Sequence, residues 1–505
     1  MAVRRLLCDT FDGRLYRRGE VLEFGEQGGV PELVWRRLGG EVLRRLAAPA
    51  PRFAWDLPPG PFRRKLEEVA EVRALLPLVR VATRREALEV LDGRRKVVCR
   101  VFAEEHRAGA PEARNAGLLP LAPRVRVEPV RGYARAALLV GEALSRVPGL
   151  EPGARDLLEE ALAALGRGPP AYSSKVGVAL EPDLTAAEAL RRVLLRLLEI
   201  LEANQEGTRA QLDSEFLHDF RVAVRRTRSA LGQAEAVLPP AALERFRAGF
   251  AWLGQITGPA RDLDVHLLEF PAYQAALPAA SRPHLEPLRA FLAARRRVEQ
   301  RRLARALGSR RYEDLLRDWR AFLAAASEPW VGDPDLAQAG RPVLEVAARR
   351  LHKALGRTLR EGRAIGDASP PEEFHELRKK CKKLRYLLEF FESLFPAAET
   401  GALIRALKGL QDNLGRYQDV HVQSAALAGF SREMEAAGSA AAGTHVALGM
   451  LLAQLGAREA ALRREFAGRF AAFAADPAVP RFKELLRATP PTDPVLPAAG
   501  GEEDP

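Results

Sequence analysis

The spacing of hydrophobic positions changes near residue 168 and divides the chain into two parts. In the first part, short apolar runs are separated by glycines, a pattern typical of strands joined by hairpins. These runs occupy residues 20–24, 32–36 and 95–102, and helical periodicity spans residues 61–76 and 151–165. The pattern predicts an α+β domain over residues 1–168 and a linker, rich in glycine and proline, over residues 169–180.

From residue 181 onward, apolar positions recur at helical spacing. Thr185-Ala-Ala-Glu188 is a capping box, and the leucines after it share one helical face through Leu201. Proline-containing breaks divide the region into about eight or more helices. They fall at residues 239–240, 258–259, 283, 328–329, 370–371 and 396. Residues 476–505 are expected to form a tail whose last part, from residue 489, is disordered.

Three short motifs recur in the same order in the two halves of the helical region. Residues 189–193 match 347–351, residues 218–221 match 375–378, and residues 261–266 match 416–421. The three offsets are 158, 157 and 155 residues. Because this order is hard to obtain by chance, we infer a tandem duplication. We expect a first helical repeat over residues 181–330 and a second over residues 331–475, each a four-helix bundle.

Composition adds a charge argument to this organisation. The 505 residues are 47% hydrophobic and 29% charged, which excludes a disordered or collagen-like chain and suits about two to four domains. The net charge of +12 suggests a polyanionic partner. However, 68 of the 78 basic residues are arginine and only 10 are lysine, so compositional bias alone could produce the excess. Whether the excess charge reflects function therefore depends on where the basic residues lie.

The cysteines and the apolar segments indicate the cellular compartment in which we expect the protein. Cys8, Cys99 and Cys381 lie far apart without a paired spacing, which argues against disulfides and thiolate metal sites and suits a reducing compartment. The first residues contain no apolar segment of the signal-peptide type. No run of 18 apolar residues is long enough for a transmembrane helix. We therefore expect a soluble cytoplasmic protein.

Basic residues gather on single faces of the predicted helices. In the first copy the face holds His218, Arg221, Arg225 and Arg228, and in the second it holds His375, Arg378, Lys382 and Arg385. Lys379, Lys380 and Lys383 lie beside the second face, and a third stripe joins Arg349, Lys353, Arg357 and Arg360. Like charges at this spacing weaken a helix by a few tenths of a kcal/mol per pair. Either acidic neighbours or a bound polyanion must offset this repulsion, so converging stripes would form a cationic groove. The alternative is a set of ordinary solvated faces.

The repeated histidines leave two interpretations open. His218 and His375 either donate to phosphate oxygens or orient a neighbouring side chain within the helical bundle. Neither belongs to a nucleophilic triad that is visible in the sequence. We therefore assign no catalytic residue.

Three carboxylates in the third repeated motif raise a similar choice. Asp262, Asp264 and Asp419 either orient the arginines or hold a divalent cation that bridges to phosphate. We favour the orienting role and assign no metal site, because Tyr417 stands in the second copy where the first has Asp262.

The duplicated motif resembles the CHAD domain, the conserved histidine α-helical domain. The resemblance covers about residues 181–475 and rests on His-x-x-Arg-x-x-x-Arg-Arg-x-Arg at 218–228, its partner at 375–385, and Leu253-Gly254 followed by Arg261-Asp-x-Asp264. It implies an all-helical fold of two related bundles with a basic surface that binds inorganic polyphosphate. The implied binding residues are His218, Arg221, Arg225, Arg226, Arg228, His375, Arg378, Lys379, Lys382, Lys383 and Arg385. To these we add Arg191, Arg349, Lys353 and Arg357 as candidates.

The N-terminal third resembles a degenerate CYTH domain, the antiparallel barrel of the triphosphate tunnel fold, which often precedes CHAD. Residues 8–19, 35–37 and 174–175 carry this resemblance. CYTH phosphohydrolases open with Glu-x-Glu-x-Lys, whose carboxylates hold Mg²⁺ or Mn²⁺. Here the chain begins Met-Ala-Val-Arg-Arg-Leu-Leu-Cys8, and only the late pair Glu104-Glu105 could supply carboxylates. We therefore expect no triphosphatase activity.

Together these features predict a protein that binds inorganic polyphosphate without catalysis or a cofactor, in the cytoplasm and in association with polyphosphate granules. One alternative is nucleic-acid binding, although Phe220 and Tyr386 are the aromatic residues near the basic stripes that could stack bases. A second alternative is a metal-dependent triphosphatase that uses the N-terminal domain. A third is a helical scaffold that docks an acidic protein. The oligomeric state is open.

Overall fold

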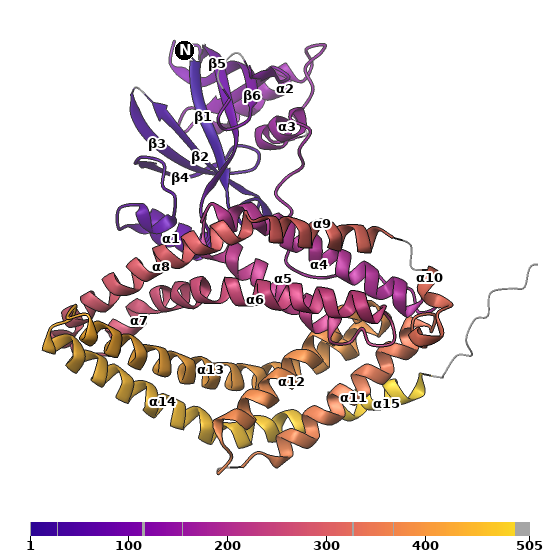
Figure 1. Cartoon of the computed structure of the whole chain (residues 1–505). Coiled ribbons are helices and arrows are strands. Elements are labelled where there is room, and N and C mark those ends of the chain that lie inside the picture. The colour runs from indigo at the N-terminus through magenta and orange to yellow at the C-terminus, as the bar shows by residue number, and fades with distance from the viewer. Residues whose placement is uncertain are drawn as a thin grey trace, which may run out of the picture. The chain divides into compact units, whose positions relative to one another are not determined.

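The computed structural model describes residues 2–27, 29–113, 117–153, 155–325, 328–366 and 368–489 (Figure 1). The chain forms two compact units, Met1–Ser173 and Ser174–Pro505. The division falls inside the segment 169–180. Residues 490–505, which hold most of the segment expected to be disordered, lie outside the described residues.

Eight antiparallel strands form the sheet of the N-terminal unit. They are β1 (Ala2–Asp9), β2 (Glu20–Gln27), β3 (Val30–Arg37), β4 (Val42–Ala47), β5 (Leu76–Leu91), β6 (Val97–Gly109), β7 (Leu119–Pro120) and β8 (Arg124–Pro129). The strand order is β4-β3-β2-β1-β5-β6-β7, and β8 also pairs with β6. The three strands expected from the sequence lie in β2, β3 and β6. Among the described strands, β4 and β7 each pair on one side only, so the sheet is open where we expected a closed barrel.

Three helices accompany this sheet: α1 (Pro61–Ala70), α2 (Ala134–Leu144) and α3 (Leu157–Ala164). The first ends before the predicted residue 76, because Glu71 has a φ of 50° that no helix continues. The third begins after the predicted residue 151, because Asp156 caps it by accepting a hydrogen bond from the Leu158 amide. Leu66 of α1 and Leu158 of α3 pack into two separate clusters of strand side chains.

The second unit is helical. Its helices are α4 (Ala186–Arg209), α5 (Ser214–Leu231), α6 (Pro240–Leu268), α7 (Phe270–Ala275), α8 (Glu286–Leu307), α9 (Arg310–Ala324), α10 (Glu328–Val331), α11 (Val343–Ala364), α12 (Pro371–Phe390), α13 (Ala397–Ala436), α14 (Ala442–Ala475) and α15 (Ala478–Ala488). Helices α4, α5, α6 and α8 contact one another in a ring, and so do α11, α12, α13 and α14. Helix α15 lies in the segment expected to be a tail, where Phe482 and Leu486 join the core.

Helix positions confirm the duplication and correct its register. Helices α4, α5 and α6 begin 157 residues before α11, α12 and α13, respectively. The offsets of 158 and 155 that we inferred for the outer motifs are therefore wrong by one and two residues. The error arose because Arg-Arg and Asp-Val-His occur by coincidence near the true equivalents. At the constant spacing, Asp262 corresponds to Asp419 and Arg261 to Gln418.

Equivalent residues of the two copies meet each other, as around a two-fold axis. Thr185 forms an antiparallel bridge with Pro342, its equivalent at the 157-residue spacing. Helix α4 contacts α11, and α5 contacts its equivalent α12. The two copies are thus related by an approximate two-fold axis that passes between these helices.

One predicted helix break does not occur. Pro259 lies inside α6, which runs unbroken from Pro240 to Leu268. An interior proline costs a helix roughly 3 kcal/mol. Because α6 packs against both α5 and α8, tertiary contacts offset this cost.

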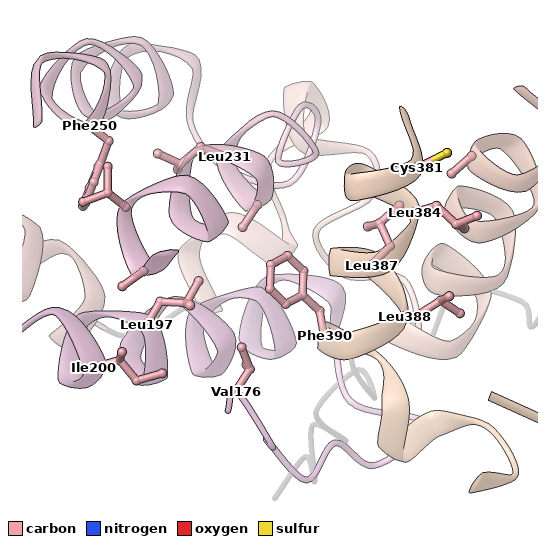
Figure 2. Close-up of a cluster of buried hydrophobic side chains, with 14 of the residues drawn as sticks. Val176, Leu197, Ile200, Leu231, Phe250, Cys381, Leu384, Leu387, Leu388 and Phe390 are labelled. Atoms are coloured by element: carbon pink, nitrogen blue, oxygen red, sulfur yellow. The ribbon is translucent and has the colours of Figure 1, made fainter. Parts of the chain in front are cut away.

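A single hydrophobic core serves both copies (Figure 2). Phe390 of α12 extends toward Leu197 of α4 and Val176, which precedes the first copy. Cys381, Leu384 and the leucines at 387 and 388 line the buried side of α12. This placement of the apolar residues turns the cationic side of α12 away from the core.

The close packing of α11 yields a stability prediction. A Cβ atom added to Gly362 would overlap the ring of Phe470, whereas one added to Gly356 on the same helix meets nothing within 4 Å. We expect Gly362→Ala to destabilise the helical unit by about 1–3 kcal/mol through overpacking. Gly356→Ala is the control and should stabilise it by up to about 1 kcal/mol. Urea unfolding followed by circular dichroism measures both, and an unchanged midpoint for Gly362→Ala would contradict the packing described.

Candidate functional site

The cationic face of α5 lies against α6. Asp213 fixes the start of α5 by accepting hydrogen bonds from the amides of Glu215 and Phe216. Apolar residues from Phe216 to Leu231 then face the core, which leaves His218, Arg221 and Arg225 half-buried on another side. Arg221 donates to the carbonyl oxygen of Gly254 at 3.4 Å and to Thr257 Oγ1 at 3.2 Å, both on α6.

Glycines on α6 make room for these guanidinium groups. A Cβ on Gly254 would lie 3.0 Å from Arg228 Nη1, and one on Gly258 would lie 3.4 Å from Arg221 Nη1. The Leu253-Gly254 element singled out in the sequence thus lets two arginines lie across the backbone of α6. Arg228 itself is exposed.

The repeated histidines orient neighbours on the next helix. His218 Nδ1 lies 3.1 Å from Arg261 Nη2, and His375 Nδ1 lies 2.9 Å from Gln418 Oε1. Each partner follows its histidine by 43 residues, which supports the corrected register. Because a guanidinium only donates, His218 accepts at Nδ1, whereas His375 donates to the amide oxygen of Gln418. These contacts favour the orienting role that the sequence left open.

The carboxylates fall into two groups. Arg378 pairs with Asp419 at 3.3 Å, and Asp262, the equivalent of Asp419, attracts Arg221 in the same way. Asp264 does not belong to this face, because its buried carboxylate pairs with the half-buried Arg296 of α8. The offset of 155 residues placed Tyr417 opposite Asp262, and we took this as evidence against a metal site. At the correct spacing of 157 residues, Asp419 is the carboxylate equivalent to Asp262. Even so, among the described residues no three His, Cys, Asp or Glu side chains gather as a metal site.

The two cationic faces converge at Arg225 and Lys382, which are equivalents at the 157-residue spacing. Burial, followed by repulsion from Arg378 and Arg225, lowers the pKa of Lys382 to about 8. Burial also lowers the pKa of Arg221. Within the described part of the chain, Arg225 and Lys382 have no hydrogen-bonded or ion-paired partner. The site therefore concentrates positive charge that Asp262 and Asp419 compensate only in part.

The buried Nε atoms of three arginines reinforce this conclusion. Those of Arg221, Arg225 and Arg378 lack a hydrogen-bond partner among the described residues. A buried donor without a partner costs about 1–3 kcal/mol. An anion with several oxygens would satisfy such donors and the charge together.

The other candidates lie elsewhere, and four of them are neutralised by ion pairs. Arg226 donates to Glu389 at 2.7 Å and lies over the ring of Tyr386, and Arg385 pairs with the same Glu389 at 2.9 Å. Arg191 pairs with Glu188, and Lys379 pairs with Glu376. Each of these four cations is thus held in an ion pair and does not join Arg225 and Lys382. Lys383, Lys353 and Arg357 lie together between α11 and α12, on a different side of α12 from Lys382, and Arg349 faces α15.

Two members of the site were missed as candidates. Arg261 adds a third cation beside Arg221, and Gln418 holds His375. Both belong to the repeated motif, and aligning it at 157 residues would have revealed them.

The N-terminal unit has a large cavity with a different charge balance. Its volume is about 1570 Å³, and seven arginines and nine carboxylates line it. Arg36 bonds Glu23 at 2.5 Å and Asp156 at 2.7 Å, and Arg5 pairs with Glu23 at 2.9 Å. The arginines deepest in this cavity are therefore already paired.

The carboxylates of Glu104 and Glu105 do not act as a pair. They follow one another on β6, so their side chains point to opposite faces of the sheet. Glu104 is buried beside the cavity, and Glu105 is exposed. Although burial favours the neutral acid, hydrogen bonds with His106 and Arg126 lower the pKa of Glu104 to about 2. One wall of the cavity thus offers a single carboxylate that is already engaged.

Comparison with known proteins identifies the class of the helical unit. Residues 192–428 match the family model of the CHAD domain. This match confirms the expected CHAD domain over α4 to α13, slightly less than half of the chain.

Solved structures add two similar chains. The CHAD domain of the plant Ricinus communis is 28% identical, with a TM-score of 0.49 over 60% of this chain and 96% of that one. PptA from Streptomyces chartreusis is 19% identical, with a TM-score of 0.43 over 57% of this chain and all of that one. No curated protein matches the chain. Over the described residues, no helix has the length and apolar character needed to cross a membrane.

The low pKa of Lys382 predicts how stability depends on pH. The folded pKa lies below that of the unfolded chain, so the protonated lysine destabilises the fold below pH 8, and this penalty fades as pH rises toward 10.5. We expect Lys382→Gln to raise the free energy of unfolding at pH 7 by about 1 kcal/mol, since solvent screens part of the repulsion. The gain should shrink at pH 9.5.

Urea unfolding at the two pH values measures this difference. Lys408→Gln on α13, outside the converging set, is the control. A loss of stability for Lys382→Gln at pH 7 would show that the protonated side chain of Lys382 does not destabilise the fold.

Proposed function

We propose that the helical unit binds inorganic polyphosphate without catalysis, at the site where the two copies converge. The observation that carries this proposal is the meeting of Arg225 and Lys382, equivalent cations from the two copies, neither of which forms an ion pair with a carboxylate in the described structure. His218, Arg261, Arg221 and Arg378 surround them with further donors. The resemblance to the CHAD family points to the same ligand.

The energetics of the site support a polyanion. Lys382, Arg225 and Arg378 are held together at a cost to stability, as the low pKa of Lys382 indicates. A chain of phosphates brings several negative charges and many acceptor oxygens in one molecule, and it releases counterions when it binds. The bound chain would therefore offset the repulsion across both copies at once.

Symmetry separates polyphosphate from nucleic acid. A linear phosphate chain is the same in both directions, so it can present equivalent groups to two copies related by a two-fold axis. A nucleic-acid strand has a direction, and it usually stacks its bases on aromatic side chains. Here Phe220 is fully buried and Tyr386 lies beneath Arg226, so neither aromatic residue near the stripes offers a platform. Nucleic acid is therefore the less favoured partner.

We extend the proposal to the rest of the chain. The N-terminal unit, which resembles a CYTH domain in sequence, would not act as a triphosphatase, because its buried carboxylates at Glu23, Glu104 and Asp156 pair with its own arginines. A divalent cation would act only as a bridge between a carboxylate such as Asp419 and bound phosphate. The protein would act in the cytoplasm, at polyphosphate granules.

Charge reversal at the converging site tests the proposal. We expect the full chain to bind long-chain polyphosphate, and the variant Arg225→Glu/Lys382→Glu to bind at least tenfold more weakly at low salt. The slope of log affinity against log salt should fall in the variant, because fewer counterions are released. Isothermal titration calorimetry at two salt concentrations measures both quantities.

The matched control is Arg289→Glu/Arg317→Glu, which changes the net charge equally at exposed residues of α8 and α9. It should bind almost as the wild type does. If both double variants lose affinity equally, the binding is non-specific and the site is wrongly assigned. Stronger competition by RNA or DNA than by polyphosphate would instead favour the nucleic-acid alternative.

The absence of catalysis is tested separately. With Mg²⁺ or Mn²⁺, we expect the full chain to release no phosphate from tripolyphosphate above the background rate. A colorimetric phosphate assay measures this release. Activity that disappears in Glu104→Gln but persists in Glu105→Gln would make the N-terminal cavity an active site and overturn the expectation.

A further inference from the structure

The second copy carries cations that the first copy lacks. At the 157-residue spacing, Lys353 corresponds to Arg196, which pairs with Glu199 at 2.9 Å, and Arg357 corresponds to the buried Ile200. Within the described residues, Lys353 and Arg357 have no ion-paired partner. The first copy thus serves as an internal reference in which the same positions are neutral or neutralised.

A cavity of about 420 Å³ lies beside these cations, between α11 and α15. It is lined by Arg349, His352 and Lys353 of α11 and by Leu486, Arg487 and Thr489 at the C-terminal end of the described chain. Three permanent cations and one histidine therefore face a single hollow.

Glu345 also lines the cavity, and it does not neutralise the hollow. Its carboxylate lies 3.4 Å from Arg341, outside the cavity lining, and 3.9 Å from Arg349. It contributes one negative charge against Arg349, Lys353 and Arg487. The lining remains net positive, which suits an anion.

The cations continue from the cavity to α12. Lys383 lies close enough to Arg350, Lys353 and Arg357 for their repulsion, after burial, to lower its pKa. On α12, Lys383 directly follows Lys382 of the converging site and points about 100° around the helix from it. A band of positive charge therefore leads from the converging site, over α12, to the cavity beside α15.

We infer that the cavity between α11 and α15, with Lys353, Arg357 and Lys383, is a second phosphate subsite that holds the distal part of a long polyphosphate chain. The inference rests on the proposed function of the converging site. A short oligophosphate occupies the converging site alone. A long chain also reaches α11, and it does so on one side only, because the first copy lacks the subsite.

The test compares chain lengths in the full-length protein. We expect Lys353→Glu/Arg487→Glu to weaken the binding of long-chain polyphosphate about tenfold at low salt and to leave the binding of tripolyphosphate unchanged. The neutral variant Lys353→Gln/Arg487→Gln should show a smaller loss with the same selectivity. Arg289→Glu/Arg317→Glu is again the control of equal charge. All four substituted residues are exposed, so the variants should fold.

Each outcome decides between the two proposals. Weaker binding of the long chain alone supports the subsite. If the variant binds both lengths as the wild type does, or loses both equally, the subsite is wrong and the converging site stands on its own test. If the wild type binds neither anion, the proposed function fails and the subsite fails with it.

Discussion

Repulsion between like charges in a half-buried site is the constraint on which the helical unit depends. Arg225 and Lys382 approach each other only because the helices that carry them are fixed from behind. Phe390 reaches across to Leu197, and Thr185 bridges Pro342, so apolar packing and backbone pairing join the two copies. The burial of these apolar residues thus offsets the destabilising repulsion between the cationic faces. Such a trade is common where binding requires an arrangement that folding alone would not favour.

The structure also separates cations that look alike in the sequence. Arg225 and Arg226 are neighbours in the chain, yet one faces the other copy unpaired and the other is held by Glu389. A rotation of 100° around α5 accounts for the difference in direction. The presence of Glu389 accounts for the difference in charge. The net charge of the chain therefore predicts an anion-binding site less well than the presence or absence of a carboxylate beside each cation.

Much of this could be predicted from the sequence, and the failures have physical causes. The period of apolar residues located the helices, and the His-led faces pointed to the converging site, because both depend on spacing within one helix. The neutralisation of Arg226 by Glu389 was not predictable, since it depends on packing between α5 and α12. The pairs of Arg191 with Glu188 and of Arg385 with Glu389 have i,i+3 and i,i+4 spacing within one helix, so the sequence could have revealed them. Pro259 was misjudged because packing on both sides of α6 outweighs a local rule. The spacing of the repeat was predicted incorrectly at two motifs, because short sequence matches lie one and two residues away from the true equivalents.

The bridge between Thr185 and Pro342 bears on how such a chain could have arisen. A residue that touches its own equivalent is what two identical subunits produce at a symmetric interface. A single ancestral copy would have formed a homodimer with the converging cationic site at its interface, built half from each subunit. Gene fusion would then have allowed the halves to diverge: Arg261 faces one histidine and Gln418 the other, and lysines occupy α11, α12 and α13 of the second half, whereas α4, α5 and α6 carry none.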